Sequence, residues 1–179
     1  MRLALLAPIL VISPAIAQPS LETWFPQLQA GVWVKVEGHH AHGVLQATKI
    51  KLLTTELDEV EITCTIDSVD AEARSLRTAL GVTVVASHRT DVQGHGSERI
   101  PFASLKPGDR VECEGQVQRD GSLLAVEIDL KRPQHDREEE EEEIAARIES
   151  VDGAKHRIVL LGVTVQMDAK TRNRTPMIE

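Results

Sequence analysis

Three histidines that lie close together, His39, His40 and His42, are the first candidates for chemistry. Neutral imidazole binds Zn²⁺ and Cu²⁺, so three rings in one turn could hold such an ion. The spacing is not one of the well-known structural zinc patterns, and the matching turn of a repeated segment, residues 116–120, has no histidine. We therefore expect a solvated polar turn here. A metal-binding protein or metal-dependent enzyme that uses these histidines remains the alternative function.

The chain has two cysteines, Cys64 and Cys113. In an exported protein they could form a disulfide, and they could equally be two small buried hydrophobic side chains. Repeated segments carry Ala146 and Val36 in their places, so the fold does not demand sulfur there. Neither cysteine adjoins a histidine or a basic residue in sequence, which disfavours a catalytic thiol.

Six consecutive glutamates, Glu138 to Glu143, form the strongest charge run. The run lacks the alternating ligand and glycine spacing of a calcium loop, and a block of like charge is typical of an extended, solvated spacer. The chain contains no G-x-S-x-G or H-E-x-x-H motif. We therefore assign no catalytic, cofactor-binding or metal-binding residue, and we expect a protein that is not an enzyme and has no cofactor.

Overall charge and composition narrow the class of partner. The formal net charge is -8, and aromatic residues make up 2% of the chain. A negative field repels polyanions, and single-strand binding uses stacked aromatics in a basic groove. Nucleic acid and anionic membrane surfaces are therefore not expected as partners.

The first 17 residues are predicted to be a signal peptide. Met1-Arg2 supplies a short positive region, Leu3 to Ile12 is apolar, and Ala15-Ile16-Ala17 has small residues suited to signal peptidase. The apolar run is shorter than the roughly 20 residues that a membrane-spanning helix needs, and no other stretch could span a bilayer. We expect cleavage near Ala17 and a periplasmic or secreted mature chain.

The elements that must position these residues come from an internal repeat. Residues 61–130 form one complete module of short alternating segments. Its first half recurs in residues 143–175 and its second half recurs in residues 28–52, with residues 131–143 as an acidic linker. The residues shared between copies are turn formers and core aliphatics, among them Gly31/Gly108, Gly38/Gly115, Ala47/Ala125, Gly81/Gly162, Val84/Val165 and Thr90/Thr171. The repeat is therefore architectural.

Three local features remain to be placed by the structure. Gly81 either kinks one long strand or turns between two short ones. A change of parity between Ala47 and Ile50 indicates a β-bulge. Residues 144–148 have helical spacing, but their match to residues 62–66 favours a strand.

The order of these motifs resembles a known family. I-x-S-V-D, L-G-V-T-V, Thr90, L-x-P-G-D-x-V-x-x-x-G and G-x-L-x-A-x-x-I follow one another, as in the bacterial exported family filed as domain of unknown function 5666. The resemblance covers one full copy and two half copies. It implies a small exported all-β domain, OB-like in character, with no assigned activity and no functional residues to transfer.

We predict an all-β fold: a small OB-like barrel module with flanking hairpins that pair into a second, permuted module. An isolated hairpin is marginal in water, which favours this pairing. Trp24 and Phe25 are expected to plug the open end of a core rather than form a docking patch. The expected function is that of an uncharacterised cell-envelope protein, a binding or structural module for a small ligand or an envelope protein. A scaffold whose edge strands pair with another protein is a further possibility.

Overall fold

The computed structural model describes residues 20–132 and 141–175. Strands are the main regular secondary structure of this part of the chain. The strands are β1 (Trp33–Ala41), β2 (Val44–Leu52), β3 (Val60–Asp70), β4 (Ser75–Thr78), β5 (Thr83–Gln93), β6 (Arg110–Val117), β7 (Leu123–Leu130), β8 (Glu142–Arg147), β9 (Ser150–Asp152), β10 (Arg157–Leu160), β11 (Val163–Gln166) and β12 (Arg172–Asn173). The short helices are α1 (Leu21–Trp24), η1 (Phe25–Gln27), η2 (Phe102–Ser104) and η3 (Gly153–Lys155). Among the described residues, no helix has the length and apolar character needed to cross a bilayer.

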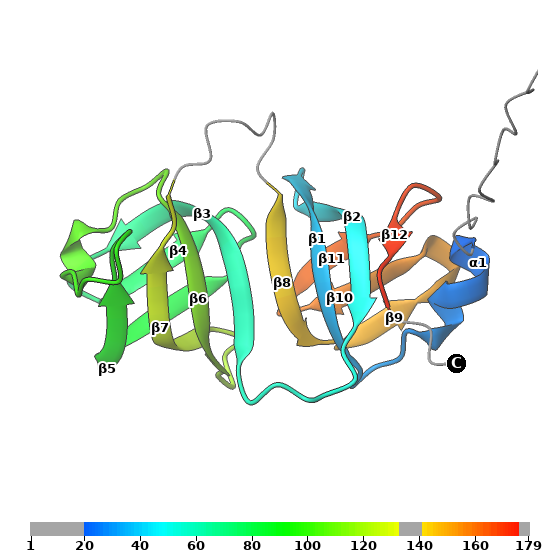
Figure 1. The fold of residues 1–179 in the computed structure, drawn as a ribbon, viewed down its shortest axis with the longest axis horizontal. Helices are drawn as coiled ribbons and strands as arrows, with labels where there is room; N and C mark the ends of the chain where they lie inside the picture. The colour runs from blue at the N-terminus through cyan, green and yellow to red at the C-terminus, as the bar shows by residue number, and fades with distance from the viewer. Residues whose placement is uncertain (1–19, 133–140, 176–179) are drawn as a thin grey trace, which may run out of the picture.

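Strands β3 to β7 close into a five-stranded barrel. They follow the order β4-β5-β7-β6-β3, and β3 also pairs with β4, which closes the ring (Figure 1). Val, Ile and Leu side chains alternate along each strand and fill the interior, as a small barrel core requires. The predicted all-β, OB-like module is confirmed.

The N-terminal and C-terminal half-modules pair with each other to form a second unit beside the barrel (Figure 1). Strand β1 pairs with β2 on one side and with β8 on the other, both antiparallel. Strand β2 pairs in parallel with β11 and with β12. The pairing that we predicted from the marginal stability of isolated hairpins is therefore present.

The two units meet along β3 and β8, the corresponding strands of the two copies. These strands pair antiparallel, and Ile62 lies opposite its own counterpart Ile144. Pairing of this kind relates the two units by a local pseudo-twofold axis. We call the junction of β3 and β8, with the strand ends around it, the seam.

Repeated glycines and threonines have the same structural roles in both copies. A Cβ atom at Gly38 would lie 2.2 Å from the main-chain oxygen of Gln46, and one at Gly115 would lie 2.2 Å from that of Leu124. Both glycines sit beside a β-bulge. In β2 the bulge falls between Ala47 and Lys49, where the change of parity had indicated one.

The two threonines tie strands together in the same way. Thr90 Oγ1 donates to the main-chain oxygen of Ala125 at 2.6 Å, and Thr171 Oγ1 donates to that of Ala47 at 2.9 Å. Both the threonines and the alanines of these bonds are among the residues shared between the copies. Their repetition reflects architecture, as the sequence indicated.

Aromatic side chains close one end of each unit. Trp24 is 2% exposed and Phe25 is 5% exposed, so the predicted plug is confirmed. Phe102 in η2 has the same place before β6 that Phe25 has before β1. The Arg74 guanidinium lies 5.3 Å from the Phe102 ring centre, and the His156 ring meets the edge of Phe25 at 5.0 Å between centres.

Strand boundaries resolve the remaining local alternatives. Gly81 has φ +83° and its N–H donates to Thr78, so it turns the chain between β4 and β5. Of residues 144–148, the first four lie in β8, so the strand that the repeat favoured is present. The acidic linker ends earlier than we predicted, because Glu142 and Glu143 belong to β8. Residues 133–140 and the predicted signal peptide lie outside the described residues.

Both cysteines are free and fully buried inside the barrel. Ile62 lies opposite Cys113, whereas Cys64 lies opposite Val111, so the two thiols are diagonal neighbours. Diagonal Cα atoms lie about 7–8 Å apart in an antiparallel pair, which is too far for an unstrained disulfide. Burial raises the pKa of Cys64 to about 12 and raises that of Cys113 well above its ordinary value.

We expect neither thiol to react with Ellman's reagent in the folded protein, because both are inaccessible and protonated at pH 8. In denaturant without reductant, both should react. The measurement is the thiol count in each state. A count of zero in denaturant would establish a disulfide instead.

Candidate functional site

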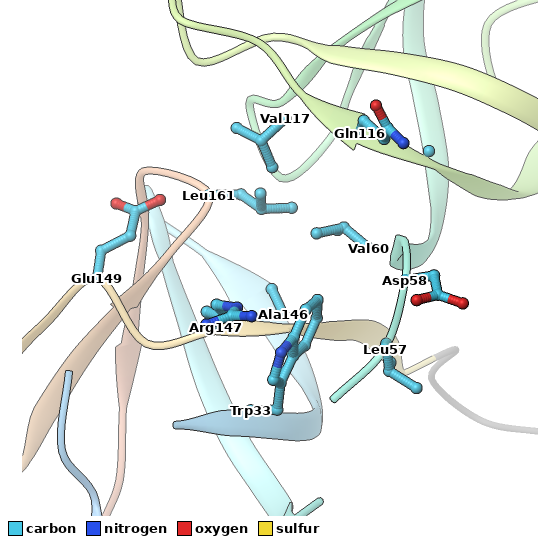
Figure 2. Close-up of a pocket in the computed structure, with 11 residues that line it drawn as sticks. Trp33, Leu57, Asp58, Val60, Gln116, Val117, Ala146, Arg147, Glu149 and Leu161 are labelled. Carbon is cyan, nitrogen blue, oxygen red and sulfur yellow. The ribbon is translucent and has the colours of Figure 1, made fainter. Parts of the chain in front are cut away.

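A cleft of about 380 Å³ opens at one end of the seam, where β3 begins and β8 ends. Figure 2 shows side chains from both units around it, with Val117 and Gln116 of β6 on one side and Arg147 and Trp33 on the other. The cleft therefore depends on how the two units meet. Its volume lies within the range of about 300–1,000 Å³ that is usual for small-molecule sites.

Apolar side chains form much of the cleft wall. Val60 begins β3, Val117 ends β6, Leu57 comes from the β2–β3 loop, and Leu161 comes from the β10–β11 turn. Val117 is 44% exposed, although it is the last residue of a strand whose earlier alternate residues are buried. The cleft thus exposes apolar surface that continues the core pattern of β6.

One aromatic and one cation stack at the cleft. The Arg147 guanidinium lies 5.4 Å from the centre of the Trp33 ring, within the range of a cation–π contact. Its Nη2 atom also lies 3.1 Å from a carboxylate oxygen of Glu56. The indole N–H of Trp33 is buried without a hydrogen-bond acceptor among the described residues. Asp58 and Glu149 add negative charge to the lining.

The two copies differ at this cleft, not in the architecture around it. Trp33 begins β1 at the place where the other copy has Arg110 at the start of β6. Val60 of β3 corresponds to Glu142 of β8. At the other end of the seam, Arg110 Nη1 accordingly lies 3.6 Å from a Glu142 carboxylate oxygen. The seam therefore has a polar end and an apolar end, and the cleft is at the apolar end.

Glu141 strengthens the polar end. Its carboxylate accepts from Thr48 Oγ1 at 2.7 Å and from Lys49 Nζ at 2.9 Å. Although partial burial acts in the opposite direction, the bonds from Thr48 and Lys49 bring the pKa of Glu141 down to about 2. The last residues of the glutamate run are therefore held by specific partners, which corrects the prediction of a solvated spacer for residues 141–143.

A row of carboxylates crosses the outer face of the barrel beside the cleft. Asp91, Glu127, Glu114 and Glu61 lie directly opposite one another on β5, β7, β6 and β3. Like charges in this arrangement destabilise a sheet. Burial and the nearby carboxylates, first that of Glu61, raise the pKa of Glu114. Arg99 pairs with Asp91 at 2.8 Å and Lys35 lies 3.4 Å from Glu61. The surface next to the cleft is therefore acidic, with cations at both ends of the row.

Replacing Glu114 with glutamine should stabilise the protein at pH 7. Because folding raises its pKa, the Glu114 carboxyl favours the folded state most at pH values below its unfolded-state pKa, near 4.5. This contribution to the stability of the folded protein is lost as the pH rises through the folded-state pKa. Glu114→Gln should therefore raise the free energy of unfolding at pH 7 by up to about 1 kcal/mol, with little effect at pH 4. Denaturant titrations at pH 7 and pH 4 measure the free energy of unfolding, and substitution of the exposed Glu72, Glu72→Gln, is the control. A destabilised Glu114→Gln protein at pH 7 would contradict the repulsion.

The structure does not bring the three histidines into a metal-binding arrangement. The polar turn that we predicted holds only His42, which has φ +53°. His39 and His40 are instead neighbours on β1, where adjacent side chains point to opposite faces. Across residues 20–132 and 141–175, no three His, Cys, Asp or Glu side chains gather in a way that could hold a metal ion.

Sequence reasoning missed the cleft and its residues. It singles out neither Trp33 nor Arg147, which falls within the ambiguous segment 144–148. The signal available in the sequence was the set of positions at which the two copies carry different residues. Trp33 aligns with Arg110, and the shared architecture does not explain this difference.

Comparison with known proteins gives one structure and one family. The silver-bound CusF structure from Escherichia coli, "CusF-Ag(I) residues 10-88", aligns with 45% of this chain and 100% of its own, at 13% identity and a TM-score of 0.32. The comparison with curated proteins gave no match. The family model described as "Domain of unknown function (DUF5666)" matches residues 15–51 and 64–129, which is more than half of the chain. The chain therefore belongs to the DUF5666 family.

Proposed function

We propose that this protein is an exported, non-enzymatic binding module whose ligand enters the cleft at the apolar end of the seam. One observation carries the proposal: the cleft exposes apolar surface at the place where one copy has Trp33 and the other copy has Arg110. Residues that serve the fold are repeated in this chain. The residues that form the cleft are not explained by that repetition.

The chemistry of the lining suits a ligand with an apolar part. Burying apolar surface is worth about 25 cal/mol per Å², and Leu57, Val60, Val117 and Leu161 offer such surface. Trp and Arg are enriched among residues that dominate binding energy. Trp33 and Arg147 are already stacked, so a ligand would meet a preorganised wall.

Export is supported by the sequence of residues 1–17, which has the charged, apolar and small-residue regions of a signal peptide. Residues 1–19 lie outside the described part of the chain. A periplasmic or secreted location would place the cleft among envelope components. Fractionation of cells with an antibody to the mature chain tests it, and a cytosolic, uncleaved product would contradict it.

Two exposed valines give a matched test of the binding site. Val117 lines the cleft, whereas Val126, at 48% exposed, lies at the β7 bulge and does not line it. A library of small aromatic and aliphatic fragments is screened by ¹⁵N–¹H NMR. Val117→Asp should weaken the best hits at least about tenfold, since a charge would replace apolar contact. Val126→Asp should leave their affinity unchanged.

Hits should shift the amide signals of residues 115–117 and 146–147 and the indole N–H of Trp33. Folding of both variants is checked from their spectra before titration. The proposal is overturned if no fragment binds in the cleft, or if the two variants lose affinity equally.

A further inference from the structure

The cleft occupies the place of a missing length of strand. Strand β3 lies between β6 and β8, but its first residue, Val60, pairs with Gly115, and Glu61 pairs with Ala145. Strand β6 continues to Val117, and β8 continues to Arg147. Both strands therefore run past the start of the strand that separates them. Two strand spacings leave about 9–10 Å between their axes, the room for one strand.

Main-chain groups of β6 face into this space. Ile66 exchanges main-chain hydrogen bonds with Gly108 and Asp109 at 2.9 and 2.8 Å, so its polar groups point toward β6. Main-chain polar groups alternate in direction along a strand, so every second residue of β6, in the series that pairs with Cys64, Ile62 and Val60, points toward β3. Val117 is the next residue in this series, and its N–H and C=O therefore also point toward the β3 side. Strand β3 begins at Val60, which pairs with Gly115, so the ladder between β3 and β6 ends two residues before Val117. The Val117 main chain makes no hydrogen bond there to the described part of the chain.

Main-chain groups of β8 face the same space from the other side. The Ile148 N–H donates to Val32 at 2.9 Å, which directs Ile148 toward β1. By alternation, the N–H and C=O of Arg147 point toward the β3 side, opposite those of Val117. They also have no main-chain partner within residues 20–132 and 141–175. Two open strand edges thus face each other across the cleft.

The two faces of this slot differ in chemistry. On the inward face, Val60 and Val117 continue the buried positions of their strands. On the outward face, Glu61 and Glu114 lie opposite each other, and a groove of about 360 Å³ joins them to Leu57, Asp58 and Glu59. Burial, and after it the nearby carboxylates of which Glu61 is the first, raise the pKa of Glu114. Glu61 itself has Lys35 Nζ at 3.4 Å.

We propose that the slot binds an extended peptide segment of another protein as an added strand between β6 and β8, with an apolar side chain facing inward and lysine or arginine side chains facing outward. This inference rests on the proposed function and names its ligand class. An added strand would satisfy the open main-chain groups of Val117 and Arg147. Its apolar residue would extend the packing of Val60, and its basic residues would meet the outward carboxylates, which supplies the charge complementarity.

Backbone methylation tests strand addition without changing side chains. The probe is the peptide acetyl-Lys-Val-Lys-Val-Lys-amide, titrated into the whole mature protein and followed by ¹⁵N–¹H NMR. Two control peptides are used: the same peptide with its central amides N-methylated, and a peptide with glutamate in place of every lysine. We expect the first to shift the Val117 and Arg147 amide signals. Methylation should weaken it at least tenfold, and the glutamate peptide should not bind.

The possible outcomes separate this inference from the proposed function. Equal binding of the methylated peptide would overturn strand addition, and equal binding of the glutamate peptide would overturn the charge pattern. If fragments bind in the cleft and no peptide does, this inference fails while the proposed function stands. If neither fragments nor peptides bind there, both fail.

Discussion

Ending the chain at Arg132 should unfold the β1–β2 hairpin and leave the five-stranded barrel intact. The truncation removes β8, which pairs with β1 over six residues, and it removes β11 and β12, which pair with β2. The barrel keeps all five of its strands. A hairpin without a partner sheet is marginal in water. Limited proteolysis with mass spectrometry should therefore show cleavage within residues 33–52 and protection of residues 60–130.

The mirror truncation is the control. Removing residues 20–57 takes away β1 and β2 and should expose β8 to β12 instead. In both proteins the protected fragment should be the barrel. Protection of residues 33–52 in the protein that ends at Arg132 would show that the hairpin is stable alone, and would contradict its dependence on the C-terminal half.

Gly115→Ala should destabilise the barrel by at least about 2 kcal/mol. The added Cβ would lie 2.2 Å from the main-chain oxygen of Leu124 and 2.9 Å from the Cα of Ala125. These are main-chain atoms of a paired strand, so relief requires the β6–β7 ladder to shift. Chemical denaturation followed by circular dichroism measures the loss.

Gly153→Ala is the matched substitution. Its Cβ would meet nothing within 4 Å, and Gly153 does not have a positive φ. It should change the free energy of unfolding by less than about 0.5 kcal/mol. Gly38→Ala should resemble Gly115→Ala, because Gly38 approaches Gln46 in the same way. Wild-type stability of Gly115→Ala would show that the bulge accommodates a side chain.

Much of the fold could be predicted because the chain contains its own comparison. Matching halves at the two ends implied a second unit, and the need of a hairpin for partners implied that the halves pair. The shared glycines and threonines were correctly interpreted as architectural. The structure adds their reasons, which are a main-chain approach at Gly38 and Gly115 and a strand tie from Thr90 and Thr171.

Some equivalences were hidden because the residues differ. Arg74 and His156 have the same positive φ and contact Phe102 and Phe25 in the same place, yet one is a guanidinium and the other an imidazole. A comparison that looks for identical letters does not find such a pair. The glutamate run misled for a related reason: partners distant in sequence, Thr48 and Lys49, hold its end.

The cleft could not be predicted from patterns within single strands. It exists because β6 and β8 extend past the start of β3, and strand ends are the least certain feature of sequence-based assignment. Its chemistry depends on Trp33 standing where the other copy has Arg110. Trp33 and Arg147 are far apart in sequence, and only the pairing of β1 with β8 places them side by side.

The most direct test of the account is a crystal structure of the protein with its best-binding fragment. We predict density for the fragment at the apolar end of the seam, in contact with Val60 and Val117 and against the stacked pair of Trp33 and Arg147. Density at another surface, with the cleft empty while the fragment is bound in solution, would contradict the assignment of the cleft as the binding site.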